Sequence, residues 1–324
     1  MSIEKQLKHE YVRASAALSC PSEVNEMVHS RWKQRNGAKP WYRARISRRV
    51  IGVALSLMLF TGFAYSTQQL LFSEHRDGFF WEIAKDSTIQ LDPAFIADIH
   101  QQLDGIRQQL AAGQFAHVYL SDLEKNISGV ESSGLISIGN PELQTDLEAW
   151  RSVLQQAGVN PLGVPDQLPN GFIFQSGMNT GAFHEVVIAD IPLVQELKHE
   201  AKQAEDGVAW RLMEAGVEAQ PGSYTTTYVN AAGEHIYVTV NEFPEDIVGF
   251  TMITPESTDY EGLDIHGETA HYIVNNQSFL SPTQLAKTVS WLHKESGRSA
   301  MYTVTTDVDR VTKEQLIAAA ESLN

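Results

Sequence analysis

The sequence predicts an α+β protein: a short helical N-terminal head, one transmembrane helix, and an antiparallel, meander-like sheet with packed helices outside the membrane. Three observations lead to this prediction. Charge divides sharply along the chain, a long uncharged run lies at the point of division, and β-branched and aromatic residues alternate with polar ones through the C-terminal third. We expect four segments, covering residues 1–49, 50–72, 73–164 and 165–324.

The charge of the chain is distributed unevenly between its two ends. Residues 1–49 hold 11 Lys and Arg against 4 Asp and Glu, a net charge of +7. Residues 50–324 hold 13 against 36, a net charge of −23. The single cysteine, Cys20, lies in the basic part, so the acidic body must fold without a disulfide.

Residues 50–72 form the predicted transmembrane helix. The run has 23 residues without a charge, and a helix needs roughly 20 to cross the hydrocarbon core of a membrane. Basic residues before a span stay on the cytoplasmic side and contact anionic lipid, so we expect a cytoplasmic N-terminus, a location in the cell membrane and an extracytoplasmic body. The orienting residues are Arg43, Arg45, Arg48 and Arg49. A buried core helix and a cleaved signal peptide are the alternatives, and a 49-residue charged leader is too long for an ordinary signal peptide.

The head, residues 1–49, has the pattern of two short helices separated by Cys20-Pro21. On the second helix one side is apolar and offers a docking face for a cytoplasmic partner, formed by Val24, Met27, Val28 and Trp32. The alternative is a solvated basic leader that only fixes topology.

The membrane-proximal region, residues 73–164, is predicted to be mainly helical. Residues 73–92 look irregular. Asp92 is a suitable N-cap and Pro93 a suitable first residue for an amphipathic helix whose apolar stripe runs from Phe95 to Leu110. A short strand is expected at 116–124, and a second helix at 141–158.

Strands dominate the predicted extracytoplasmic domain, residues 165–324. FIFQSG and HEVVIADIP are the first two, residues 192–215 are predicted to be helical, and YTTTYVN and HIYVTVNEF form a hairpin around a glycine turn. The later strands are GFTMITPE, ETAHYIVNN, KTVSWLHKE and SAMYTVTTD. Trp291 and Tyr302 are expected to pair across strands. Thr312 and Gln315 form the capping box of a closing helix.

The best candidate for catalytic chemistry is IHGETAH, which brings His266, Glu268 and His271 close together in sequence. Two histidines five residues apart diverge on a helix and point to opposite faces of a strand, so they do not form the usual zinc pair. A surface turn that enters a strand is the better interpretation. The sequence also lacks a nucleophile elbow, a phosphate-binding loop and a dinucleotide fingerprint. We therefore expect no enzymatic activity, no catalytic residues, no cofactor or metal, and no nucleic-acid partner.

The arrangement of a basic head, one span and an α+β body resembles anti-sigma-type membrane proteins of endospore-forming Gram-positive bacteria. LPNGFIF, GETAHYIV, SWLHKESGRSAMYTV and VTKEQLIAAAESL are similar, in this order, to segments of the extracytoplasmic domain of unknown function forty-three sixty-seven. The resemblance covers about residues 165–324. The head lacks the histidine and cysteine arrangement of a zinc-binding anti-sigma domain.

This resemblance implies a role in signalling or in the cell envelope. The first hypothesis is a membrane-anchored regulator of anti-sigma type. Its body would sense or bind an envelope or extracellular ligand, and its head would dock a sigma factor or another regulator. The alternative is a membrane-tethered envelope protein, with a binding or structural role and an inert head.

Overall fold

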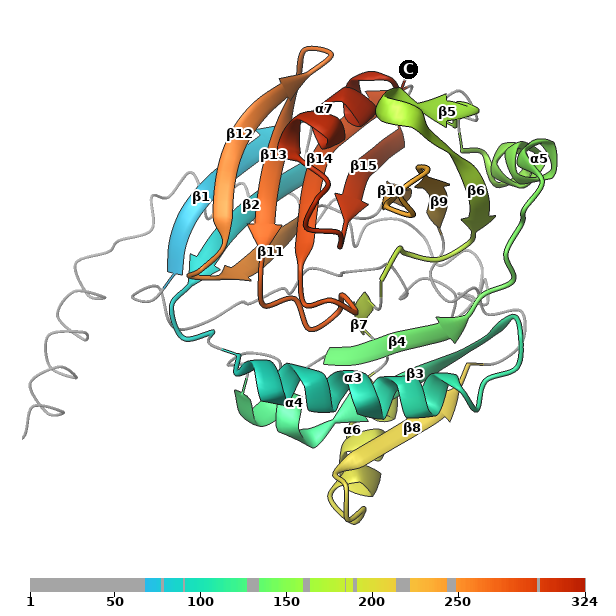
Figure 1. Ribbon diagram of the computed structural model, residues 1–324. Helices are drawn as coiled ribbons and strands as arrows, with labels where there is room; N and C mark the ends of the chain where they lie inside the picture. The colour runs from blue at the N-terminus through green and yellow to red at the C-terminus, as the bar shows by residue number, and fades with distance from the viewer. Residues whose placement is uncertain are drawn as a thin grey trace, which may run out of the picture. The chain divides into compact units, whose positions relative to one another are not determined.

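Three β-sheets and several helices make up the part of the chain that the computed structural model describes (Figure 1). The description covers residues 68–76, 79–89, 91–126, 134–159, 164–183, 185–188, 191–213, 222–243, 249–295 and 298–323. Strands outnumber helices within these ranges, and the class is broadly α+β.

The largest sheet has eight strands, and every neighbouring pair in it is antiparallel. Its order is β12 (Asp259–Ile265), β13 (Glu268–Asn275), β14 (Ala286–Glu295), β15 (Arg298–Thr306), β10 (His235–Phe243), β9 (Ser223–Val229), β6 (Phe172–Met178) and β5 (Gln167–Leu168). The four strands β12–β15 follow each other as a meander. The order then returns to earlier parts of the chain, so the predicted simple meander is correct only for this half of the sheet.

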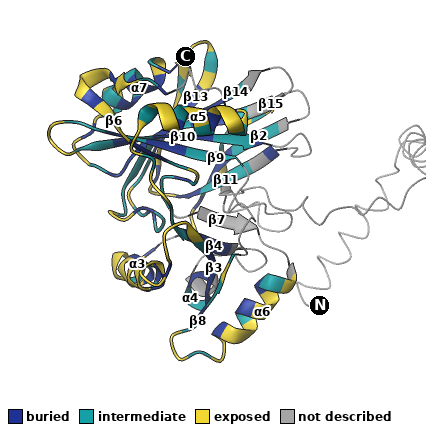
Figure 2. Cartoon of the chain, turned by 90° about the vertical axis from the view of Figure 1, so that its right-hand side faces the viewer, coloured by how far each residue is buried: buried dark blue, intermediate teal, exposed yellow. Residues whose placement is uncertain are grey.

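One face of the eight-stranded sheet carries the main hydrophobic core beneath helices α5 (Leu147–Ala157) and α7 (Lys313–Glu321). Alternate strand residues such as Val238, Val289 and Val304 point into this core, as the period of two in a strand requires. The predicted pair Trp291 and Tyr302 is confirmed, since the two residues are register partners and their rings stack with centroids 5.4 Å apart. Figure 2 shows both helices with exposed outer surfaces.

The opposite face of the same sheet packs, near β13 and β14, against a three-stranded sheet. That sheet consists of β1 (Gln68–Arg76), β2 (Phe79–Asp86) and β11 (Gly249–Pro255). Trp81 and Ile83 of β2 form a buried cluster with Ile273, Leu292 and Met301 of the large sheet. The pairing of β2 with β11 is parallel.

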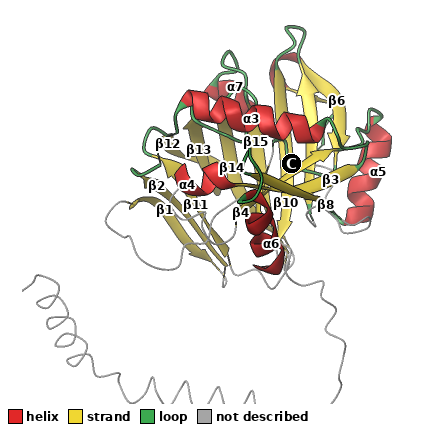
Figure 3. Ribbon diagram, turned by 90° about the horizontal axis from the view of Figure 1, so that it is seen from below, coloured by secondary structure: helices red, strands yellow, loops and turns green. Residues whose placement is uncertain are grey.

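A four-stranded sheet with helices packed on both faces forms the third layer (Figure 3). Its order is β7 (Glu185–Ile188), β4 (Gly134–Asn140), β3 (Gln114–Leu120) and β8 (Val208–Leu212), and α4 (Ser121–Asn126) follows β3. One face buries the apolar stripe of α3 (Pro93–Arg107), and the other buries that of α6 (Ile191–Ala201). The chain leaves this sheet after β4, contributes α5, β5, the 3-10 turn η3 (Pro169–Gly171) and β6 to the large-sheet layer, and returns at β7.

Two predicted helix starts are confirmed. The side chain of Asp92 accepts a hydrogen bond of 2.7 Å from the Ala94 amide at the start of α3. Thr312 and Gln315 form the reciprocal capping box at the start of α7. Short side-chain acceptors satisfy amide groups that have no partner within the helix, which is why the sequence predicted both ends well.

The predicted transmembrane helix is wrong in its last five residues, because Gln68 to Phe72 belong to strand β1. They pair with β2 through a hairpin that also replaces the irregular structure predicted for residues 73–92. Within the described ranges, no helix has both the length and the apolar character needed to cross a bilayer. Residues 1–67, which include the predicted helical head and the rest of the predicted span, lie outside the described residues.

Two predicted helices are too long. The helix predicted for 192–215 ends at Ala201, and Val208–Leu212 forms β8 instead, because these residues pair with β3 and bury Ala209 against α6. The helix predicted for 141–158 begins at Leu147, where Asp146 supplies the N-cap. Position 164, where we placed a boundary, lies between α5 and β5, and the four-stranded sheet takes strands from both sides of it.

Candidate functional site

Two connecting segments meet where the four-stranded sheet adjoins the large sheet. One is the loop 179–183, which leads from β6 in the large sheet towards β7 in the four-stranded sheet. The other is the turn 278–285, between β13 and β14. Ligand sites occur preferentially at such junctions between layers or domains.

Loop 179–183 is held against the large sheet by a hydroxyl group and an aromatic ring. The Thr225 hydroxyl donates a hydrogen bond of 2.7 Å to the Thr180 carbonyl, and it lies 2.9 Å from the Thr239 hydroxyl on the neighbouring strand. The Phe183 ring packs edge-on against the Tyr237 ring, with centroids 5.5 Å apart. Both ends of the loop are therefore fixed to β9 and β10.

The turn 278–285 is fixed by three further hydrogen bonds. The Thr283 hydroxyl donates to the Asp307 carbonyl over 2.8 Å, and the Ser281 hydroxyl donates to the Leu285 carbonyl over 2.6 Å. A ring nitrogen of His100, on α3, lies 2.8 Å from the Phe279 carbonyl. The turn is thereby tied both to the large sheet and to the layer that contains α3.

A small pocket of about 110 Å³ lies between these two segments. Its apolar lining includes Met178, Phe183 and Leu280. Ser137 of β4 also lines it; this residue is only 8% exposed, and its hydroxyl has no hydrogen-bond partner among the described residues. Arg107, from the last turn of α3, is the charged residue of the described lining. The remaining lining residues are Gly139, Pro141, Thr180, Gly181, Ala182 and Pro282.

A histidine–carboxylate pair lies next to Tyr237, the residue that packs against Phe183. His235 Nε2 is 3.3 Å from Asp307 Oδ1, and the Asp307 side chain is 7% exposed. Tyr237 packs against the His235 ring, with centroids 5.4 Å apart. Burial, and secondly the Asp307 carboxylate, raise the pKa of Tyr237, so this phenol stays protonated and can donate a hydrogen bond.

A second polar row crosses the four-stranded sheet from the pocket. Register partners place His117 of β3 between Ser137 of β4 and Arg211 of β8. Burial lowers the pKa of His117, and its Nδ1 has no hydrogen-bond partner among the described residues. Arg211 is 2.7 Å from Glu200 and 3.2 Å from Glu196 on α6, and the hydrogen bond to Glu196 is the main reason its pKa is raised. Ser137 therefore has a partly buried imidazole with a lowered pKa as its register partner on β3.

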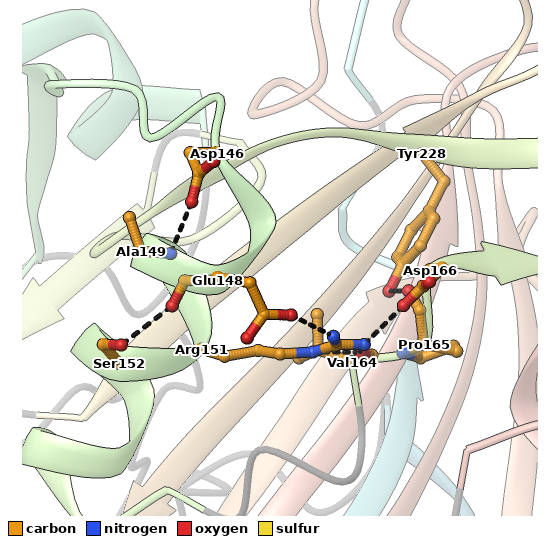
Figure 4. Close-up of polar contacts among 9 residues, drawn as sticks. All are labelled: Asp146, Glu148, Ala149, Arg151, Ser152, Val164, Pro165, Asp166 and Tyr228. Atoms are coloured by element: carbon orange, nitrogen blue, oxygen red, sulfur yellow. Dashed lines mark hydrogen bonds and ion pairs between the residues drawn. The ribbon is translucent and has the colours of Figure 1, made fainter.

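The polar contacts drawn in Figure 4 hold the fold together. The Arg151 guanidinium of α5 lies 2.7 Å from both Glu148 and Asp166, and it donates a hydrogen bond of 2.8 Å to the Val164 carbonyl. The Tyr228 hydroxyl donates to the next carbonyl, that of Pro165, over 3.0 Å. Together these contacts fasten the segment before β5 to α5 and to β9.

A buried histidine lies between the large sheet and the three-stranded sheet. His271 has no exposed surface, and the rings of Phe72 and Trp81 lie with their centroids 4.0 and 4.4 Å from its own. Its Nδ1 is 3.0 Å from the Tyr260 hydroxyl, whereas its Nε2 has no hydrogen-bond partner among the described residues. Burial lowers the pKa of His271 to about 4, so the ring is neutral at pH 7.

The structure places the residues of IHGETAH where the turn interpretation expects them. His266 lies in an exposed turn between β12 and β13 with φ of 55°, and Gly267 follows it with φ of 81°. His271, by contrast, is buried in β13. Within the described ranges no group of three potential metal-binding side chains comes together.

The predicted docking residues (Val24, Met27, Val28 and Trp32) and the predicted membrane-orienting residues (Arg43, Arg45, Arg48 and Arg49) lie outside the described residues. Sequence reasoning missed the junction pocket altogether, because its walls come from α3, β4, the loop after β6 and the turn before β14. None of these segments carries a local motif. The signals present in the sequence were only the small residues around 179–183 and the turn-forming residues around 278–285.

Comparison with models of protein families, with curated proteins and with solved structures gave no match to the chain.

Proposed function

We propose that this chain is a regulatory binding protein whose folded body senses a small ligand at the junction pocket. The observation that carries the proposal is the convergence of one buried hydroxyl, one guanidinium and an apolar wall on a pocket between two layers. Ligand sites are usually mainly apolar with a few placed polar groups, and this pocket presents polar and apolar surface in similar amounts.

The position of the pocket supports a regulatory role. Loop 179–183 is the direct connection between a strand of the large sheet and a strand of the four-stranded sheet. A ligand that touches this loop therefore contacts the segment through which a movement of one layer would reach the other. Such a ligand changes the preferred arrangement only by as much as its affinity differs between the two arrangements.

The N-terminal head supplies the second half of the proposal. Two features of the head favour a docking segment for a macromolecule. The head carries a net charge of +7, against −23 for the remainder, and one side of its second predicted helix is apolar, formed by Val24, Met27, Val28 and Trp32. The resemblance to anti-sigma-type proteins suggests a sigma factor or a similar regulator as that partner. An inert head, with the body acting alone as a binding module, is the competing hypothesis.

A thermal-shift screen of the full chain tests the sensing role. The library would hold neutral, cationic and anionic molecules small enough for the pocket, and each would be applied to the wild type and to Ala182→Trp, which fills the pocket. A ligand at ten times its Kd stabilises the folded state by about 1.4 kcal/mol. For a chain of this size, that corresponds to an increase in Tm of about 3–6 °C.

We expect at least one chemical class to raise the Tm of the wild type and to leave Ala182→Trp unchanged. Arg310→Gln, on an exposed residue that does not line the pocket, is the control and should respond like the wild type. No stabilising molecule in the library, or stabilisation that persists in Ala182→Trp, would refute the sensing role.

A further inference from the structure

We infer that the junction pocket takes a short aliphatic carboxylate, with the alkyl stem against Met178, Phe183 and Leu280 and the carboxylate at Arg107 and Ser137. This inference rests on the proposed function, because it names the chemical class of the ligand for the same pocket.

The volume limits the size of the ligand. Pockets for drug-sized molecules measure roughly 300–1,000 Å³, and the junction pocket measures about 110 Å³. A cavity of about 150 Å³ accommodates benzene, and a water occupies about 30 Å³ in the liquid. The junction pocket therefore holds roughly four to six non-hydrogen atoms, which is the size of acetate, propionate or butyrate.

The lining determines the polarity of the ligand. Met178, Phe183 and Leu280 present apolar atoms that stabilise an alkyl stem when water leaves. Ser137 is more than nine-tenths buried, and its hydroxyl, which has no partner among the described residues, can donate one hydrogen bond to a ligand oxygen. The lining therefore offers apolar contacts for a carbon stem and a donor for an acceptor oxygen.

The charge of that acceptor follows from Arg107. The guanidinium contacts Asp104 through one nitrogen, Nη2, at 2.9 Å. Nη2 carries a second hydrogen, which can form a parallel pair of donors with a hydrogen on Nε or Nη1. Arg107 and Asp104 are both about half-exposed, so their ion pair is weak and does not fully engage the guanidinium. A planar carboxylate accepts two parallel hydrogen bonds from such a group, which neutral amides and alcohols cannot match.

Two sources could supply this chemistry: a free short-chain acid, or the carboxylate of the last residue of a peptide. Both present a short carbon stem next to a terminal carboxylate. Propionate represents the first source. The peptide acetyl-Gly-Gly-Ala represents the second, with its amidated form as the uncharged partner.

Ligand-observed NMR titration of the full chain would measure these affinities. We expect propionate to bind at least ten times more tightly than propionamide, which has the same shape without the charge. Arg107→Gln should weaken propionate at least tenfold and leave propionamide unchanged, while Arg310→Gln should alter neither. If acetyl-Gly-Gly-Ala binds and its amide does not, with an affinity above that of propionate, the peptide terminus is the source; the reverse order identifies the free acid.

Equal affinities for propionate and propionamide, or full propionate binding by Arg107→Gln, would overturn the inference. The sensing role and the carboxylate specificity can be refuted separately. Neutral or cationic molecules that bind the wild type and not Ala182→Trp would keep the sensing role and remove the carboxylate. The absence of any pocket-dependent ligand in the thermal-shift screen would remove both. Arg107 lies on a half-exposed helix surface, so Arg107→Gln should fold even if Ala182→Trp does not.

Discussion

The fold should lose stability in mild acid because His271 is buried as a neutral ring. The pKa of His271 falls from its ordinary value of 6.5 to about 4 through burial. In the unfolded chain the imidazole binds a proton as the pH falls through 6.5, whereas in the folded chain it stays neutral until about 4. The contribution of the neutral His271 ring to the free energy of unfolding is therefore complete above pH 6.5, and it is lost progressively between pH 6.5 and pH 4.

The size of this loss follows from the same two values. One unit of pKa difference corresponds to about 1.4 kcal/mol, so the complete loss is about 3 kcal/mol. That is a large part of the roughly 5–15 kcal/mol by which a domain is stable. The neutral rings of Phe72 and Trp81 lie against His271 and keep water from it, so a charge on the buried ring loses its hydration.

Urea unfolding of the full chain at pH 7 and pH 4.5, followed by tryptophan fluorescence, would measure the effect. Acid also protonates carboxylates, so the useful quantity is the difference between the two pH values for each variant. His271→Phe and His271→Gln should lower stability at pH 7 but lose less on acidification than the wild type, by about 2–3 kcal/mol. His199→Gln, at an exposed position of α6, should behave like the wild type. Equal acid sensitivity in the wild type and both His271 variants would show that another group is responsible.

Two further predictions concern packing and the head. A Cβ on Gly177 would lie 2.0 Å from the Trp150 ring, so Gly177→Ala should cost about 1–3 kcal/mol in urea unfolding. Gly105→Ala, in open space on α3, should instead stabilise by about 0.5–1 kcal/mol, and the same sign for both would contradict the packing argument. Trp32→Ala should reduce co-purification of a cytoplasmic partner, because a buried aromatic anchor often contributes at least about 2 kcal/mol to binding. Lys33→Ala should have little effect on co-purification. If Trp32→Ala and Lys33→Ala recover equal amounts of the partner, the head has no docking role.

Sequence signals predicted the structure correctly where residues a few positions apart form the hydrogen bonds of the backbone. The N-cap Asp92, the capping box of Thr312 with Gln315, and the hairpin of β9 with β10 each depend on residues a few positions apart. The Trp291–Tyr302 pair was also predictable, since the two strands are joined by a short turn and the register follows from it. Such features need no knowledge of distant segments.

Distant pairing explains the wrong predictions. Val208–Leu212 continues a helical pattern in the sequence, but these residues pair with strand β3, about ninety residues earlier, and bury one face against α6. Strand β2 pairs in parallel with β11, about 170 residues later. The predicted transmembrane helix included Gln68 to Phe72 only because these residues are uncharged. In the structure the same residues pair with β2. In each case tertiary contacts outweigh a local preference that is worth less than about 1 kcal/mol per residue.

The path of the chain gives the junction pocket its significance. The segment from α5 to β6 belongs to the large-sheet layer, while β4 before it and β7 after it belong to the four-stranded sheet. Loop 179–183 must therefore cross from one layer to the other, and it does so with Thr180 bonded to Thr225 and Phe183 packed on Tyr237. A molecule held between this loop and Ser137 contacts both layers at once. Any relative shift of the layers changes the shape of the pocket, and by reciprocity any preference of the ligand for one shape shifts the layers.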